Sequence, residues 1–206
     1  MTPELGEAER LAVAGAPAGL RPCYAAILGL DRVLSRIAVA ASEPMLAQLR
    51  LAWWRDRCAA LDRTGHPLLE ALGGCWHAGS EPLVALVDAW EAAALADIGL
   101  AASAEPLAAA RCAAMAACAE ADRRAGMAAA RCWTLVTLAD HAGGAAERAA
   151  MLAQAGAATL PRLPRSLRPL AILGGLARRA ARRGGGRLIG DRLSPFAAMR
   201  LGIFGR

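Results

Sequence analysis

Hydrophobic residues return along much of this chain at every third or fourth position, which is the spacing of one face of an α-helix. Serine–glutamate–proline segments, glycine pairs and prolines interrupt these stretches where helices begin or end. The pattern predicts helices over residues 4–14, 20–41, 44–63, 66–77, 82–99, 105–140, 145–157, 164–183 and 194–204. The 105–140 element is either continuous or broken near Gly126.

The composition supports helices over strands. Alanine and leucine dominate a sequence that is 56% hydrophobic, and both are strong helix formers. A length of 206 residues suits one domain with a substantial core. We therefore expect an all-α, single-domain helical bundle over residues 1–183, followed by a C-terminal segment over 184–206.

Charge divides the chain unevenly. Residues 1–161 carry 13 arginines against 17 acidic residues, a net charge of −4. Residues 162–206 carry 11 arginines against the single Asp191, a net charge of +10. All 24 basic residues are arginine, which indicates a compositional bias of the genome, but such a bias does not explain why the acidic residues are missing from the last fifth.

Two features bear on the compartment. The longest stretch without charge, residues 149–161, has 13 residues, whereas a membrane span needs about 18. Glu4, Glu7 and Glu9 follow the first residue, the opposite of a basic secretory leader. The sequence predicts a cytoplasmic protein whose six cysteines, with no CxxC pair, are free thiols in helices rather than disulfides or metal ligands.

Asp31 stands out within the 20–41 helix because it falls in the middle of an apolar stripe. The 44–63 helix carries a stripe on which Arg50 and Arg57 flank Trp53. A buried carboxylate is costly without a partner, so we expect Asp31 to pair with Arg50 or Arg57. The pair would either tether the two helices or line a polar cavity for an anionic ligand such as a diphosphate, which guanidinium groups bind well.

The segments Ser42-Glu43-Pro44-Met45-Leu46 and Leu49-Arg50-Leu51-Ala52-Trp53-Trp54-Arg55-Asp56, with Arg21, Tyr24 and Asp31 before them, resemble the squalene/phytoene synthase family. The resemblance is clear over about residues 20–70. From there to about residue 183 it is weak and rests mainly on the spacing of the predicted helices. It implies a shortened helical bundle of the isoprenoid-synthase type. Active members of that family join two allylic diphosphates and hold Mg²⁺ on two aspartate-rich motifs.

The aspartates that such an enzyme needs are missing from this chain. Ser35, Arg36 and Val39 occupy the positions of the first motif, and no D-x-x-x-D pattern occurs there or around residues 122–147. We therefore expect no catalytic residue, no metal site and no cofactor. The resemblance points to the family's non-catalytic branch, which includes assembly factors of respiratory complex I.

The 164–183 helix is basic on one side. Arg165, Arg168, Arg179, Arg182 and Arg183 fall within about 100° of arc, opposite a row of leucines. These arginines either form an ordinary solvated face or contact an anionic membrane surface. Nucleic acid is disfavoured because the patch has no interleaved aromatic residues and no recognisable binding motif.

Three functions remain open from the sequence. The first is a catalytically inactive assembly or scaffold factor at the inner face of a membrane, with a protein partner. The second is an active prenyl-diphosphate transferase with a divergent Mg²⁺ site. The third is a carrier that binds an isoprenoid or another lipid without chemistry.

Overall fold

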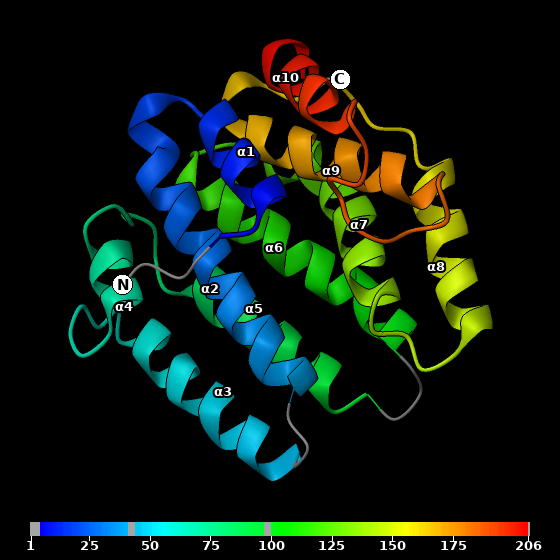
Figure 1. Ribbon diagram of the computed structural model, residues 1–206. Helices are drawn as coiled ribbons and strands as arrows, with labels where there is room; N and C mark the ends of the chain where they lie inside the picture. Colours follow the sequence, from blue (N-terminus) through cyan, green and yellow to red (C-terminus); the bar gives the residue numbers. More distant parts are fainter. Residues whose placement is uncertain (1–4, 41–43, 97–99, 206) are drawn as a thin grey trace.

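The ribbon of the computed structural model shows an all-helical bundle, described over residues 5–40, 44–96 and 100–205 (Figure 1). Its longer helices are α1 (Glu7–Gly15), α2 (Arg21–Ala40), α3 (Pro44–Ala59), α4 (Pro67–Gly73), α5 (Glu81–Ala94), α6 (Ala104–Cys118), α7 (Arg123–Ala139), α8 (Ala145–Ala157), α9 (Arg168–Ala181) and α10 (Ser194–Phe204). Short 3-10 turns lie at Ala18–Leu20, Leu100–Ser103 and Arg165–Leu167. No strand occurs within these described ranges, which confirms the all-α prediction.

Each of the nine predicted helices has a counterpart in the structure, but several of them begin or end at other residues than predicted. The bounds of α8 and α10 agree with the predicted 145–157 and 194–204. In contrast, α3 ends at Ala59 because Leu61 takes a left-handed backbone conformation with a φ of 49°. The Ser42-Glu43 start signal lies outside the described residues.

The long 105–140 prediction is two helices, and the break is not at Gly126. The chain turns between α6 and α7, where Glu120 has a φ of 47° and Asp122 caps α7 by accepting a hydrogen bond from the Arg124 amide at 2.9 Å. Gly126 lies inside α7, where a Cβ would come within 2.9 Å of the Cys112 sulfur. This glycine serves close packing rather than a turn.

The serine–glutamate–proline segments mark where helices begin, but their serine side chains do not cap the helices. Ser80 and Ser103 occupy the N-cap positions of α5 and α6, but neither side chain caps a backbone amide. Pro82 in α5 and Pro67 in α4 lie in the first turns, where a missing amide hydrogen costs nothing. The cap of α4 comes from His66, whose Nδ1 accepts from the Leu68 amide at 3.1 Å.

The bundle is built around α7, which packs against α6, α8 and α9. On one side α5 joins α6 to the peripheral α3, and on the other α10 lies over α9 and α1 (Figure 1). Gly174 allows α9 to approach α7 closely, since a Cβ there would sit 2.7 Å from Ala129 backbone atoms. The predicted C-terminal segment therefore packs on the bundle through α10.

Buried side chains join distant parts of the chain. Tyr24 is fully buried. Its hydroxyl donates a hydrogen bond to the Ser166 carbonyl at 2.6 Å, and this bond links α2 to the turn before α9. Trp76, Trp90 and Trp133 are core residues. None of the helices in the described part of the chain combines the length and apolar composition of a bilayer span.

Candidate functional site

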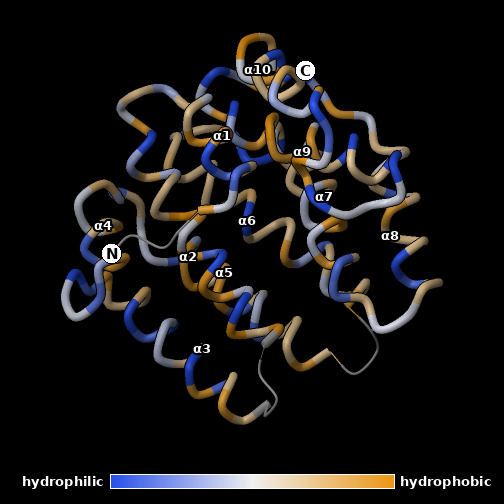
Figure 2. The backbone as a smooth tube through the Cα atoms, viewed as in Figure 1, coloured by the Kyte–Doolittle hydropathy of each residue, from blue (hydrophilic) through white to orange (hydrophobic). Residues whose placement is uncertain are grey.

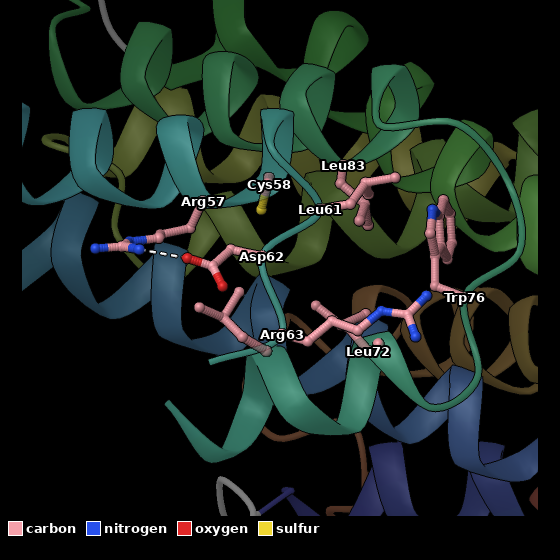
Figure 3. A pocket seen from close by; sticks show the side chains of 10 residues that line it. Arg57, Cys58, Leu61, Asp62, Arg63, Leu72, Trp76 and Leu83 are labelled. Atoms are coloured by element: carbon pink, nitrogen blue, oxygen red, sulfur yellow. Dashed lines mark hydrogen bonds and ion pairs between the residues drawn. The ribbon is translucent and has the colours of Figure 1, made fainter. Parts of the chain in front are cut away.

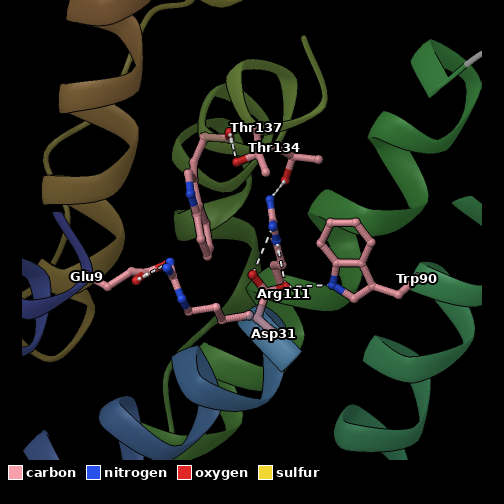
Figure 4. Close-up of polar contacts among 8 residues, drawn as sticks. Glu9, Asp31, Trp90, Arg111, Thr134 and Thr137 are labelled. Atoms are coloured by element: carbon pink, nitrogen blue, oxygen red, sulfur yellow. Dashed lines mark hydrogen bonds and ion pairs between the residues drawn. The ribbon is translucent and has the colours of Figure 1, made fainter. Parts of the chain in front are cut away.

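Asp31 is buried at the centre of the bundle, as predicted, but its partner is Arg111 of α6 and not Arg50 or Arg57 (Figure 4). Two parallel hydrogen bonds of 2.9 Å join the Arg111 Nε and Nη2 to the two oxygens of Asp31. Both side chains are almost fully buried. A bidentate pair of this kind is the strongest arrangement of guanidinium and carboxylate.

Two further helices complete the network. The Trp90 indole of α5 donates to Asp31 Oδ1 at 2.8 Å, and Arg111 Nη1 donates to the Thr134 hydroxyl of α7 at 3.1 Å (Figure 4). The guanidinium carbon of Arg111 also lies 4.0 Å from the ring centre of Trp133 and 5.1 Å from that of Trp90. The network therefore ties α2, α5, α6 and α7 together.

The network leaves little for a ligand to bind. Each carboxylate oxygen of Asp31 accepts a hydrogen bond, and all three guanidinium nitrogens of Arg111 donate one. A diphosphate could reach Arg111 only by displacing Asp31, which would then be buried without a cationic partner. Of the two roles open to Asp31, the geometry matches the tether.

Glu9 lies on the edge of this network (Figure 4), where it pairs with Arg32. Burial raises the pKa of Glu9, while the Gly6 amide and Arg32, whose Nη1 is 3.4 Å from Glu9 Oε2, act in the opposite direction. Among the described residues, Asp31 is the only buried acidic residue. In the same ranges, no three His, Cys, Asp or Glu side chains lie close enough to share a metal ion.

The predicted inward stripe of α3 faces outward. Leu49 is 63% exposed and Trp53 is 39% exposed, and Arg50 is exposed beside them. The buried side of α3 consists of Ala47, Leu51, Trp54 and Cys58. Because α3 is hydrophobic on both sides, its periodicity did not identify the side that meets the core.

Arg57 lines a small pocket between α3 and α4, where it pairs with Asp62 (Figure 3). Hydrogen bonds from the Thr64 hydroxyl and amide, together with Arg57, lower the pKa of Asp62 to about 2. The pocket has a volume of about 30 Å³, with Cys58, Leu72 and Trp76 among its walls. That space suits a water molecule and not a prenyl chain.

The positions of the first synthase motif do not converge on a cavity. Arg36 and Val39 are exposed near the end of α2, and Ser35 is half-buried. Their side chains would have to be carboxylates directed at one point to hold Mg²⁺.

The basic residues predicted on the 164–183 helix separate into three environments. Arg165 is exposed in the turn before α9, whereas Arg168 is only 6% exposed and cannot contact a surface. Burial, with Arg162 and Arg165 nearby, lowers the pKa of Arg168. Arg179, Arg182 and Arg183 gather at the C-terminal end of α9.

That end of α9 borders a groove that the sequence did not reveal. The groove has a volume of about 580 Å³ and lies between α9 and α10. Besides Arg179, Arg182 and Arg183, it is lined by Arg178 and by Arg200 of α10. The missed signal was Arg200, which lies among apolar residues in the C-terminal segment.

Arg111 was also missed. Its position among Leu107, Ala108 and Met115 on an apolar stripe of α6 was the available signal. That stripe marks Arg111 as a candidate for burial, but charge alone does not distinguish it from Arg50 or Arg57 as the partner of Asp31.

Comparison of the chain with protein-family models, with curated proteins and with solved structures yields no match in any of the three.

Proposed function

We propose that this protein is a non-catalytic scaffold or assembly factor of squalene/phytoene synthase-like descent, which works at a membrane surface and binds a protein partner there. The descent rests on the segment Pro44–Asp56 and on Asp31, which resemble that family. By the same resemblance, the fold would be a shortened isoprenoid-synthase bundle and the partner a respiratory complex. The inner face of the membrane is the proposed location.

The observation that carries this proposal is the filled centre of the bundle. Asp31 and Arg111 satisfy each other and the polar side chains around them, so the interior holds an ion pair where a ligand-dependent protein needs free polar groups. This interior therefore favours a function that is carried out at the surface.

Two parts of the surface could contact a protein partner or a membrane. The outward side of α3 exposes Met45, Leu46, Leu49 and Trp53, and exposed apolar groups gathered on one helix mark interaction sites more often than chance. This face, which we call the α3 face, supports the protein-binding part of the proposal. The basic end of α9 supports the membrane part.

Titration with farnesyl diphosphate tests the absence of catalysis. Tryptophan emission and diphosphate release would be followed with and without Mg²⁺, with an active squalene synthase as the positive control. We expect no Mg²⁺-dependent change in either signal. Diphosphate release would instead establish the prenyl-transferase alternative, and binding without release would favour the carrier.

A further inference from the structure

The outward side of the short helix α10 is apolar. Phe196, Met199 and Ile203 are 68%, 63% and 60% exposed, and their spacing places them on one side of the helix. The opposite side, with Ser194, Ala198 and Leu201, is buried against the bundle. Figure 2 shows α10 at the edge of the molecule with hydrophobic residues along it.

The arginine groove runs beside this helix. Besides the arginines, the groove is lined by small or aliphatic residues, including Ala171, Gly175 and Ala197. At Gly175 a Cβ would lie 2.6 Å from Leu201, so this glycine lets α10 cross α9 closely. Helix α10 therefore lines the groove through Ala197, Arg200 and Leu201 and exposes Phe196, Met199 and Ile203. We call the groove together with this exposed side of α10 the α9–α10 face.

Positive charge on the α9–α10 face is only partly neutralised. Asp191 pairs with both Arg179, at 2.9 Å, and Arg183, at 3.0 Å. Arg182 donates to the Gly156 carbonyl. Within the described residues, Arg178 and Arg200 form no ion pair.

Two donors in the groove are also removed from water. The Nε atoms of Arg178 and Arg179 are buried and have no hydrogen-bond partner within the part of the chain that the structure describes. Buried donors without acceptors are unfavourable, and both belong to arginines that line the groove. Phosphate oxygens suit guanidinium groups in charge and geometry.

We propose that the α9–α10 face is an anionic phospholipid site, in which the groove binds the headgroup phosphate while Phe196, Met199 and Ile203 enter the acyl boundary. This inference rests on the membrane association in the proposed function and gives it a location and a ligand class. A lipid fits better than a nucleic acid because an apolar surface lies beside the phosphate groove, as in interfacial helices. A free phosphate would use the groove and leave the exposed side chains of α10 without a role.

Vesicle flotation tests both halves of the surface with the full chain. Vesicles of phosphatidylcholine with phosphatidylglycerol would be compared with phosphatidylcholine alone. The Arg178→Gln/Arg200→Gln variant should weaken binding to the anionic vesicles by about tenfold or more, since each arginine near such a surface contributes appreciably. The matched control Arg50→Gln/Arg124→Gln removes the same charge elsewhere and should bind almost as well as the parent protein.

A second pair of variants tests the exposed apolar side of α10. Phe196→Ser/Met199→Ser should lose most vesicle binding, whereas Met45→Ser/Leu49→Ser, which removes comparably exposed residues of the α3 face, should retain it. Circular dichroism and thermal melting would confirm that all four variants fold. Arg200→Gln alone, at an exposed position, provides a second arginine variant if the double variant does not fold.

Each outcome separates this inference from the broader proposal. If the parent protein binds anionic vesicles and the α10 variants bind equally well, the α9–α10 face is the wrong surface although membrane association stands. If the parent protein binds neither vesicle, the membrane part of the proposed function fails as well. Binding of duplex nucleic acid or of inorganic phosphate, abolished by Arg178→Gln/Arg200→Gln in the absence of vesicle binding, would overturn the lipid assignment.

Discussion

Asp31 shows how a single buried charge depends on its surroundings. Two of its contacts come from Arg111, 80 positions away, and a third comes from Trp90. Attraction between the charges offsets the cost of removing both from water only while the pair is intact.

We expect Asp31→Ala to lower the free energy of unfolding by about 3–5 kcal/mol, because Arg111 would remain buried and charged without its partner. Urea denaturation followed by circular dichroism measures the change. Asp56→Ala, at an exposed position on α3, is the matched control and should shift stability by less than about 0.5 kcal/mol. An unchanged midpoint for Asp31→Ala would contradict the tether.

The cysteines are a second test at the residue scale. Desolvation raises the pKa of Cys58 and Cys132 to about 12, and it is also the main cause that raises the pKa of Cys112 to about 11. Since the thiolate is the reactive form, these three thiols should react slowly with iodoacetamide at about pH 8 and rapidly in denaturant. Peptide mass spectrometry resolves the sites, and fast labelling of the folded chain would contradict their burial.

The same raised pKa values have a consequence for alkaline stability. Above the ordinary thiol pKa, an unfolded chain ionises while the folded thiols keep their protons. The unfolded state then binds fewer protons, so stability should fall as the pH rises from about 9 toward about 11. Replacing Cys58 and Cys132 with alanine should reduce this dependence on pH.

At the scale of elements, α9 is held by its close contact with α7. Gly174→Ala would place a methyl group 2.7 Å from the Ala129 backbone, which cannot move as a side-chain end can. We expect a loss of about 1–3 kcal/mol of stability, measured by thermal or urea unfolding. Gly19→Ala is the control, because no atom lies within 4 Å of a Cβ at that position. Equal stability of the two variants would show that the helices adjust easily.

Helix α3 illustrates the limit of periodicity. Its two sides differ little in hydrophobic content, because leucine and tryptophan occur on both, as Trp53 and Trp54 show. The side that packs is decided by α5, against which α3 lies. The pairing we predicted for Arg50 and Arg57 failed for this reason.

At the scale of the whole molecule, the excess of arginine in residues 162–206 becomes a surface feature because α9 ends beside α10. If the α9–α10 face binds anionic lipid through charge, raising ionic strength should weaken binding as the screening length falls from about 10 Å at 0.1 M salt to about 3 Å at 1 M. Flotation over this range measures the effect, with circular dichroism to show that the fold persists. Salt-independent binding would indicate that insertion of apolar side chains dominates.

The sequence by itself determined the helical class, the positions of most helices, the burial of Asp31 and the concentration of arginine near the C-terminus. Each depends on local periodicity, on propensity or on counting charges, which nearby residues supply. Only the tertiary structure decided that Asp31 meets Arg111, that α3 turns Leu49 and Trp53 outward, and that Arg200 joins the end of α9. Those features depend on which helices pack together. The hydrophobic periodicity around a residue reports on its own helix and carries no information about a contact partner that is distant in the sequence.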